Sequence, residues 1–403
     1  MTKQRIMKAA TVAFALMFVV FGCENVTDVS ENSEPEVENQ ILDGQYIVVM
    51  NESSGMFKIG NVSQIEAVRM EVISRIDLEA GEVVNKFNHT IAGFTAKLSD
   101  VQLEKLKNDE NVNYVEKDRI HVFAPPCGTP NGGPCEDDPD DGDDGDSSQD
   151  TPYGINRVNG GVTYTGSNVA WIIDTGIDLD HPDLNVDASN GFNAFTNGRD
   201  GKSLDDGNGH GTHVAGTIAA IDNNEGVIGV AAGATVVPVK VLDSRGSGSY
   251  SGVIAGVDHV GANGSNGDVA NMSLGGPTSD ALDDAVLAAS SNGIKFALAA
   301  GNSSEDANNS SPARVNGSNI VTISAMDSND NWASFSNYGN PPIDYAAPGV
   351  SVNSTWKDGG YNSISGTSMA APHAAGVLLL GNASTDGTVN NDPDGNSDSI
   401  IVH

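Results

Sequence analysis

A segment near the C-terminus, Ser365-Gly366-Thr367-Ser368-Met369-Ala370-Ala371-Pro372-His373, constrains the fold more than any other part of the chain. The run from Ala370 to Leu380 is mostly small and apolar, which is typical of a helix buried in a core. Ser368 then stands at the N-terminus of that helix. A chain of 403 residues is long enough for two domains, one of them with a substantial core. The serine is either a nucleophile or an ordinary helix cap, and this segment alone leaves both interpretations open.

An acid and a base occupy comparable places upstream. The apolar residues 169–173 are typical of a buried parallel strand, and Asp174 follows them at once. A carboxylate there lies at the C-terminal edge of a sheet, where open α/β folds gather their chemistry, although an aspartate can also simply open a turn. His210 stands where a glycine-rich stretch ends and a small-residue helix begins; it can equally be a cap, and His213 is a competing candidate. Together the three segments form an acid, base and nucleophile set in the chain order Asp, His, Ser.

These segments carry a family resemblance. Asp174-Thr175-Gly176, His210-Gly211-Thr212-His213 and Gly366-Thr367-Ser368-Met369-Ala370 resemble the three signature segments of subtilisin-like serine peptidases, and the resemblance runs from Gln149 to about Leu380. It implies a doubly wound, mostly parallel α/β sheet and the hydrolysis of peptide bonds through an acyl-enzyme. By the same resemblance Ser368 is the nucleophile, His210 the general base and acid, and Asp174 the residue that orients the imidazole.

The resemblance also implies an oxyanion hole and a substrate cleft. Asn302, after Ala299-Ala300-Gly301, looks like the family's oxyanion-hole amide, although an asparagine after glycine is also a common turn residue. Two segments that would otherwise be taken for loops resemble the walls of the cleft, between which a peptide would add as a strand. The residues expected to bind substrate are Gly246, Ser247, Gly248, Ser273, Leu274 and Gly275. Since no charged residue is placed as a specificity anchor, we expect broad cleavage with a mild preference for apolar or aromatic P1 residues.

A structural Ca²⁺ site is the further expectation from the resemblance. Residues 221–227 match the family's calcium loop in length and small polar character, and two upstream side chains complete the set. Oxygen ligands from three separate segments suit Ca²⁺. The expected ligands are side-chain oxygens of Gln149, Asp183 and Asn223 and the carbonyls of Ile221, Glu225 and Val227.

The region before the catalytic part has the pattern of a small α+β domain. Strands are expected at 45–50, 83–87, 93–98 and 113–116, and helices over 62–75 and after Ser99-Asp100. This β-α-β-β-α-β order predicts a split βαβ, ferredoxin-like module. Its position and pattern resemble the inhibitory propeptide of the same family, and an unrelated α+β domain is the alternative.

The N-terminus and the linker carry signals for export and processing. Lys3, Arg5 and Lys8 precede an apolar stretch that ends in Val20-Phe21-Gly22-Cys23, which resembles a bacterial lipoprotein box with lipidation at Cys23. Residues 124–148 are rich in Asp, Pro and Gly and are expected to be a solvated linker. Cys127 and Cys135 within it are expected to pair as a local disulfide in an oxidising compartment, a metal pair being the alternative. Maturation is expected to cut in this region, with Phe123–Ala124 as an attractive bond.

The predicted organisation therefore has six parts: a signal peptide (1–23), a tether (24–44), the propeptide (45–123), the linker (124–148), the catalytic domain (149–385) and a polar C-terminal tail (386–403). The formal net charge of -34 and the pI of about 4.2 disfavour nucleic-acid and anionic-membrane partners, so a membrane contact is expected only through the lipid. We expect an exported monomer, secreted or held at the cell envelope. The alternatives are a non-catalytic binding protein that keeps the fold and a protease–propeptide complex that never matures.

Overall fold

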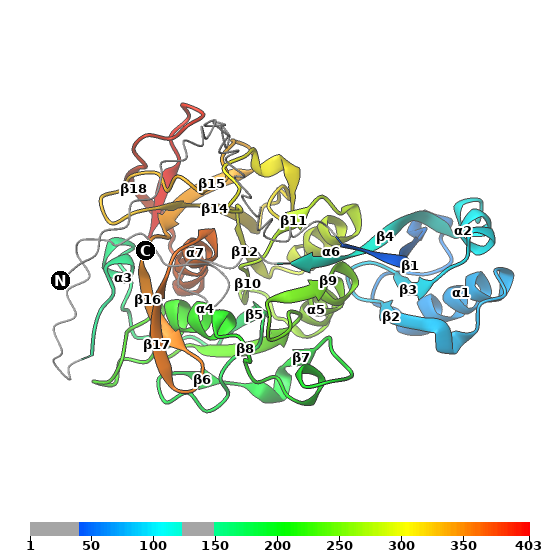
Figure 1. Cartoon of the computed structure of the whole chain (residues 1–403), viewed down its shortest axis with the longest axis horizontal. Coiled ribbons are helices and arrows are strands. Elements are labelled where there is room, and N and C mark those ends of the chain that lie inside the picture. Colours follow the sequence, from blue (N-terminus) through cyan, green and yellow to red (C-terminus); the bar gives the residue numbers. More distant parts are fainter. Residues whose placement is uncertain (1–39, 123–148) are drawn as a thin grey trace, which may run out of the picture. The chain divides into compact units, whose positions relative to one another are not determined.

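The computed structural model describes residues 40–122 and 149–403 (Figure 1). The predicted leader, the lipidation at Cys23, most of the tether, the linker and the Cys127–Cys135 disulfide lie outside the described residues and stay predictions.

Residues 40–122 form the expected small α+β module. Its elements are β1 (Gln40–Met50), α1 (Val62–Arg75), β2 (Val83–Phe87), β3 (Gly93–Lys97), α2 (Asp100–Lys107) and β4 (Val112–Val122), with 3-10 turns at Glu52–Ser54 and Ala80–Glu82. The order along the sheet is β2-β3-β1-β4, with antiparallel pairs throughout, which is the split βαβ arrangement. β1 begins at Gln40, five residues before the predicted start, because its first residues pair with the long end of β4.

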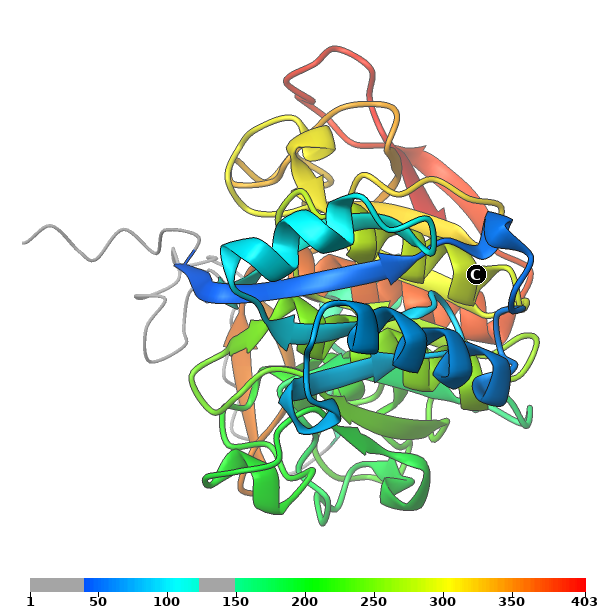
Figure 2. The same cartoon turned by 90° about the vertical axis from the view of Figure 1, so that its right-hand side faces the viewer.

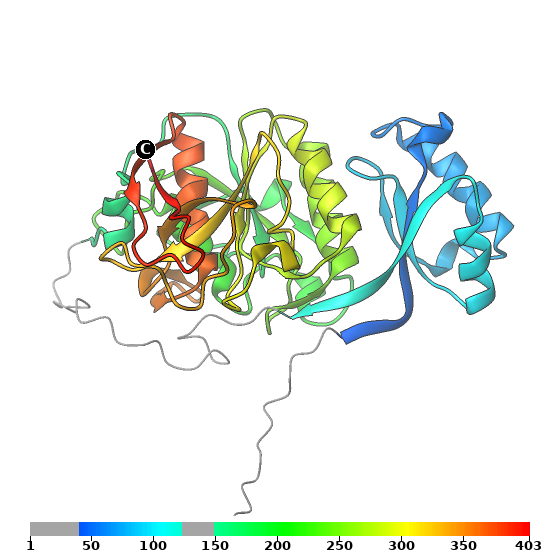
Figure 3. The same ribbon diagram turned by 90° about the horizontal axis from the view of Figure 1, so that it is seen from above.

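The module's sheet is buried on both faces, because alternate residues of a strand point to opposite sides. Val48 and Met50 of β1 pack with α1, whereas Ile47 and Val49 join the core of the catalytic part. Figures 2 and 3 show α1 and α2 on one face of this sheet. The other face therefore depends on the catalytic part for its burial.

Within residues 149–403, ten strands form one sheet in the order β18-β19-β15-β14-β12-β10-β5-β8-β6, with β7 also on β8. All pairs in it are parallel except β18 with β19. The sheet strands are β5 (Ala170–Asp174), β6 (Asn185–Val186), β7 (Phe192–Asn193), β8 (Thr235–Lys240), β10 (Val269–Met272), β12 (Lys295–Ala299), β14 (Ile320–Met326), β15 (Ile343–Pro348), β18 (Ser384–Thr388) and β19 (Ser399–Val402). The predicted doubly wound, mostly parallel fold is confirmed.

Helices cover both faces of this sheet. α5 (Tyr250–Asn263) and α6 (Asp280–Ser290) pack on one face, and α4 (His210–Ala219) and α7 (Thr367–Leu380) pack on the other. The remaining elements are α3 (Tyr153–Arg157), β9 (Ser247–Ser249), the pairs β11 (Gly276–Pro277) with β13 (Ser310–Ser311) and β16 (Val352–Trp356) with β17 (Gly360–Ile364), and 3-10 turns at Ala188–Asn190, Asp200–Lys202 and Ala307–Asn309. The chain passes from β5 to β8 on one side and then to β10 on the other. This change of direction is where open α/β sheets bind their ligands.

The C-terminal segment, predicted as a polar tail, contains a buried strand. β19 pairs in parallel with β15 and therefore extends the central sheet, and β18 adds beside it. Ile400, Ile401 and Val402 are buried in this strand. Three apolar β-branched residues suffice for a short buried strand, whereas the acidic loop before them dominated the composition of the whole segment. In the part of the chain that the structure describes, no helix has the length and apolar character needed to span a membrane.

Candidate active site

Asp174, His210 and Ser368 come from three elements that meet at the carboxyl edge of the central sheet. Asp174 ends β5, His210 begins α4, and Ser368 is the second residue of α7, which packs against α4. His210 Nδ1 lies 2.8 Å from Asp174 Oδ1, and all three side chains are buried. The carboxylate thus fixes the Nδ1–H tautomer of the imidazole, in which Nε2 carries the lone pair. That tautomer is the one in which an imidazole acts as a base.

Local contacts explain why α4 begins at His210. Gly209 precedes it with φ of 116°, and a Cβ there would lie 2.3 Å from the Trp356 ring, so only glycine fits this turn. The Asp206 carboxylate accepts hydrogen bonds from Gly209 N at 2.9 Å and from Thr212 N at 3.0 Å. Asp206 therefore satisfies backbone donors at the start of the helix, although it is not the formal cap.

His213, the alternative to His210, is buried and hydrogen-bonded within the core. His213 donates from Nε2 to the carbonyl of Val352 at 2.8 Å, and burial lowers its pKa to about 3. His373, one turn after the serine, donates from Nδ1 to the carbonyl of Met369 at 2.8 Å, and burial lowers its pKa to about 4. Both rings are therefore neutral at pH 7 and fixed within the core.

The two groups predicted as oxyanion donors, the Asn302 side chain and the Ser368 amide, both lie near Gly366. Asn302 Oδ1 accepts hydrogen bonds from Thr367 N at 2.8 Å and from Thr367 Oγ1 at 2.9 Å, which turns Nδ2 the other way. A Cβ built on Gly366 would lie 3.5 Å from Asn302 Nδ2 and 3.7 Å from Ser368 N. Asn302 Nδ2 and Ser368 N therefore both lie close to Gly366, two residues before the serine.

Ser273 connects the serine to one wall of the predicted cleft. Its hydroxyl donates to the carbonyl of Ser368 at 2.7 Å, and the Ser368 hydroxyl donates to the carbonyl of Ser273 at 3.3 Å. Asn271 Nδ2 donates to Ser273 Oγ at 2.8 Å. Ser273 and Leu274 are buried directly after β10, and Gly275 follows them.

The other predicted wall already carries a strand. β9, which contains Ser247 and Gly248 and follows Gly246, pairs antiparallel with the end of β4. The register joins Ile120 to Ser249 and Val122 to Ser247. Figure 3 shows the end of β4, in cyan, beside the green part of the chain. The last strand of the N-terminal module is therefore added to this segment through main-chain pairing.

Asp258 on α5 is a second contact with the propeptide. Its carboxylate accepts four hydrogen bonds from the turn between β2 and β3: Asn88 N at 3.0 Å, His89 N at 2.7 Å, Thr90 N at 2.8 Å and Thr90 Oγ1 at 2.9 Å. Arg69, fully buried in α1, donates to the carbonyl of Phe87 at 2.9 Å and so supports the same turn. A buried charge with this many partners is stabilising rather than costly.

Two acidic side chains of β4 lie at helix N-termini of the catalytic part. Asp118 accepts from Ser251 N at 3.1 Å and from Ser251 Oγ at 2.6 Å in the first turn of α5. Glu116 accepts from Ala281 N at 3.1 Å in the first turn of α6, and burial raises its pKa. Carboxylates are favoured at these positions by the unpaired N–H groups and the helix dipole.

The predicted calcium ligands lie together around Gln149. Its Nε2 lies 2.5 Å from the carbonyl of Ile221, 2.9 Å from that of Val227 and 3.3 Å from Asn223 Oδ1. Asp183 accepts from Asn223 Nδ2 at 3.0 Å and from Val227 N at 3.1 Å. The Glu225 amide donates to Asn223 Oδ1 at 2.8 Å, while its side chain is exposed. Three oxygens therefore converge on one point.

Residues 166–388 match the Subtilase family (Peptidase_S8), and residues 45–122 match Peptidase inhibitor I9. The chain belongs to the subtilase family. It is 43% identical over 347 residues to alkaline serine exoprotease A of Vibrio alginolyticus, an alignment that covers 83% of this chain but only 60% of the exoprotease. It is 41% identical over 335 residues to subtilisin NAT of Bacillus subtilis subsp. natto, covering 80% of this chain and 78% of that one.

A solved structure agrees with this assignment. A cold adapted subtilisin-like serine proteinase is 39% identical, with a TM-score of 0.53, over 62% of this chain and 96% of its own. The family and the fold predicted from the signature segments are thus confirmed, and the N-terminal module is an I9-type inhibitor domain.

Two charged residues near the site, Lys240 and Asp258, were missed by the sequence reasoning. Lys240 is the last residue of β8 and is fully buried, and Asp258 is the one acidic residue of α5. The signal for both is a single charge within a buried, mainly apolar element, since such a charge needs partners from elsewhere. The partners themselves come from distant segments and have no local sequence signature.

Proposed function

We propose that this chain is a calcium-stabilised serine endopeptidase, exported as a self-inhibited zymogen. The observation that carries the proposal is the 2.8 Å contact between Asp174 Oδ1 and His210 Nδ1 at the sheet edge where the first turn of α7 carries Ser368. An acid that fixes the tautomer of a base beside a buried serine is the arrangement that makes a hydroxyl nucleophilic.

The reaction follows from these groups. The Ser368 hydroxyl attacks the scissile carbonyl while His210 Nε2 takes the hydroxyl proton, and Asp174 stabilises the resulting imidazolium. The oxyanion accepts hydrogen bonds from Asn302 Nδ2 and Ser368 N. His210 then returns the proton to the leaving amine, which leaves an acyl group on Ser368. Water, deprotonated by the same imidazole, hydrolyses that ester and regenerates the enzyme.

Substrates are polypeptides bound by their backbones. The antiparallel pairing of β4 with β9 supports this, because main-chain hydrogen bonds on a sheet edge do not depend on side-chain identity. Gly246, Ser247 and Gly248 form one wall, and Ser273, Leu274 and Gly275 form the other. We expect broad specificity with a mild P1 preference for apolar or aromatic residues.

The N-terminal module inhibits the enzyme until it is removed. Three contacts support this role: β4 pairs with β9, the Glu116 and Asp118 carboxylates accept hydrogen bonds at the N-termini of two helices, and Asp258 accepts hydrogen bonds from the turn between β2 and β3. Cleavage in the segment after Val122 separates the module from the enzyme without disturbing any of them. Inhibition then ends only when the freed module dissociates or is degraded.

A Ca²⁺ ion fits the oxygens around Gln149. The carbonyls of Ile221 and Val227 and Asn223 Oδ1 converge on Gln149 Nε2, a donor whose place a cation can take, and Gln149 Oε1 accepts from Asn223 N and Asn224 N, so the Gln149 side chain has to rearrange when the ion binds. Asp183 supplies the negative charge. The described residues hold no group of three or more His, Cys, Asp or Glu suited to a metal, so this site depends mainly on neutral oxygens. The ion stabilises the fold by joining Gln149 to the 221–227 loop.

Export, lipidation at Cys23 and release of the catalytic domain by maturation complete the proposal. An anchor on Cys23 lies on the propeptide side of the cut, so processing frees a monomeric enzyme from the membrane.

The test is expression of the exported chain and its Ser368→Ala variant in calcium, with Ser384→Ala as a matched control at an exposed serine. We expect the wild type and the control to cut themselves after Phe123 or within the linker and to digest casein, and Ser368→Ala to do neither. If all three chains stay intact and inert, the binding-protein alternative is favoured. If the wild type and the control cut themselves, Ser368→Ala does not, and none of the three digests casein, the complex that never matures is favoured instead.

A further inference from the structure

Lys240 is a fully buried cation beside the proposed catalytic pair. It ends β8, and the register of β8 with β5 places it directly next to Asp174. A buried ammonium is costly unless oxygens surround it. Three do: the Thr175 carbonyl at 2.5 Å, the Asp205 carbonyl at 3.3 Å and Asp200 Oδ1 at 3.3 Å. The side chain thus joins three segments.

Thr175 connects Lys240 to the proposed catalytic pair through hydrogen bonds. Its amide donates to Asp174 Oδ1 at 2.7 Å, the same oxygen that His210 contacts. Its hydroxyl accepts from Gly211 N at 2.9 Å, in the first turn of α4. Its carbonyl accepts from Lys240. Every polar atom of this one residue is therefore used to relate the acid, the helix that begins with His210, and the buried cation.

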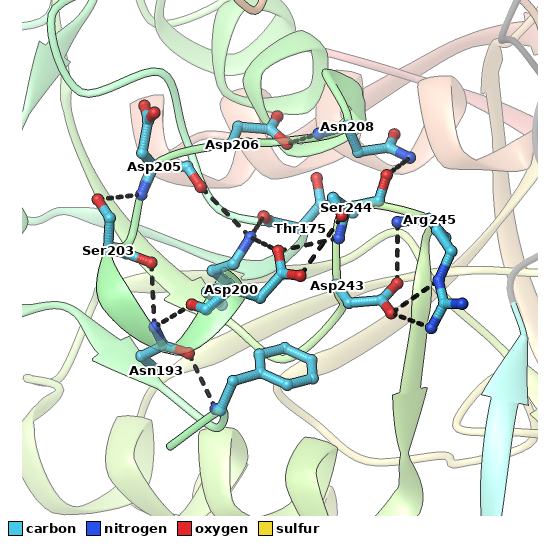
Figure 4. Close-up of polar contacts among 12 residues, drawn as sticks. Thr175, Asn193, Asp200, Ser203, Asp205, Asp206, Asn208, Asp243, Ser244 and Arg245 are labelled. Carbon is cyan, nitrogen blue, oxygen red and sulfur yellow. Dashed lines mark hydrogen bonds and ion pairs between the residues drawn. The ribbon is translucent and has the colours of Figure 1, made fainter. Parts of the chain in front are cut away.

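The contact of Lys240 with the Asp205 carbonyl also leads to the start of α4. Asp205 precedes Asp206, whose carboxylate accepts from Gly209 N and Thr212 N at the start of α4. Figure 4 shows Thr175, Asp200, Asp205 and Asp206 in one network of polar contacts. Lys240 therefore ties together the segment that follows the acid and the segment that leads to the base.

Asp200 supplies the negative charge beside Lys240 and also holds the loop that contains Ser244. Besides its ion pair with Lys240, its Oδ1 accepts from Ser244 N at 3.0 Å, in the loop that leads to β9 (Figure 4). Removal of this carboxylate leaves the contact of Lys240 with Thr175 in place. The two residues can thus be tested against each other.

We propose that Lys240 is a positioning residue, whose ammonium holds the Thr175 carbonyl so that Asp174 and His210 keep the geometry needed for proton transfer. The inference rests on the proposed triad. A methionine at position 240 fills a similar volume but donates nothing, so the Thr175 peptide is free to tilt. Small displacements of a catalytic base cost about 10–100-fold in rate.

The test compares Lys240→Met and Lys240→Arg with Asp200→Asn on a peptide substrate in calcium. We expect Lys240→Met to lower kcat about 10–100-fold with KM within about twofold, and Lys240→Arg, which still donates, to recover at least half of that loss on a logarithmic scale. Asp200→Asn is expected to raise KM or lower the unfolding temperature while kcat stays within about threefold. Equal kcat losses in Asp200→Asn and Lys240→Met, or an unchanged kcat in Lys240→Met, overturn the proposal.

A second measurement does not depend on turnover or maturation. In the Ser368→Ala chain, the proton on His210 Nδ1 is followed by NMR as a downfield resonance. We expect Lys240→Met to shift or broaden it, Lys240→Arg to do so less, and Asp200→Asn to leave it in place. If Lys240→Met does not fold, a shift in Lys240→Arg but not in Asp200→Asn supports the proposal, and no shift overturns it. An inert wild type contradicts the proposed function but leaves this measurement valid.

Discussion

Asp258 offers the sharpest test of how the propeptide is held. Its carboxylate accepts three backbone N–H groups and one hydroxyl from the turn at Asn88, His89 and Thr90, and the residue is 6% exposed. Hydrogen bonds to a charged acceptor contribute about 1.5–3 kcal/mol each, against about 1 kcal/mol for neutral ones. These contacts are made only when the propeptide is bound, so their loss is a loss of inhibitor affinity.

The two substitutions at this position have different expected sizes. Asp258→Asn keeps one acceptor oxygen but places an NH₂ against the Asn88 amide, so we expect a loss of about 2–3 kcal/mol, or roughly 30–150-fold in affinity. Asp258→Ala leaves the three backbone donors of the turn without an acceptor, for which we expect about 4 kcal/mol, or close to 1,000-fold. Asp284→Asn is the matched control, because Asp284 makes a single 2.6 Å contact with Tyr114 at an exposed position.

The assay follows the full chain after self-cleavage. Hydrolysis of a small chromogenic peptide is recorded on dilution, and the lag before full activity reports dissociation of the propeptide. We expect the lag to shorten from wild type through Asp258→Asn to Asp258→Ala, with Asp284→Asn within a few-fold of wild type. The final rate should be equal in all four, since Asp258 faces the propeptide. A lag in Asp258→Ala within threefold of the wild-type lag refutes the reasoning.

Three further outcomes follow from the buried polar groups. His213 and His373 have pKa values of about 3 and 4 in the fold, so these two side chains bind more protons in the unfolded state below pH 6.5. Their contribution to the stability of the Ser368→Ala chain should therefore be lost as pH drops from 6.5 towards 4, by roughly 1 kcal/mol per pH unit for each histidine. In denaturant titrations His373→Asn should lower the slope of stability against pH by about that amount, and an unchanged slope contradicts the assignment. Asn302→Leu should lower kcat by about 10²–10³ with little change in KM, the loss known from subtilisin itself, and a kcat within threefold of wild type excludes its oxyanion role. Calcium at 1,000 times its Kd should stabilise the Ser368→Ala precursor by about 4 kcal/mol, so the unfolding temperature should be lower with chelator than with calcium. Asp183→Asn should abolish this difference in unfolding temperature, and the exposed Asp222→Asn should keep it. Equal effects of the two substitutions argue against the site.

The family and the sheet were predictable because their signals are local. Asp174 directly follows an apolar strand, His210 follows a glycine turn, and Ser368 begins an apolar helix, so a few neighbouring residues define each one. The order of elements in the propeptide was predictable for the same reason, since strand and helix periodicities are read within about ten residues.

What the sequence analysis missed depends on contacts between distant segments. Lys240 lies beside Asp174 only through the register of β8 with β5, and Asp258 meets Asn88–Thr90 across 168 to 170 positions. The strand at Ser399–Val402 was also missed because its stability depends on a distant segment. Three apolar residues after an acidic loop gain their stability from β15, not from their own sequence.

The central claim is that Ser368 is a nucleophile activated by His210 and Asp174, and covalent labelling tests it most directly. Wild type and variants, each freed of the propeptide by processing in trans with a trace of wild-type enzyme, are treated with a fluorophosphonate, which reacts with activated serines, and the adduct is located by peptide mass spectrometry. The account predicts one adduct, on Ser368, that disappears in His210→Ala and falls strongly in Asp174→Asn. An adduct on another residue, or labelling of Ser368 that survives in His210→Ala, would contradict it.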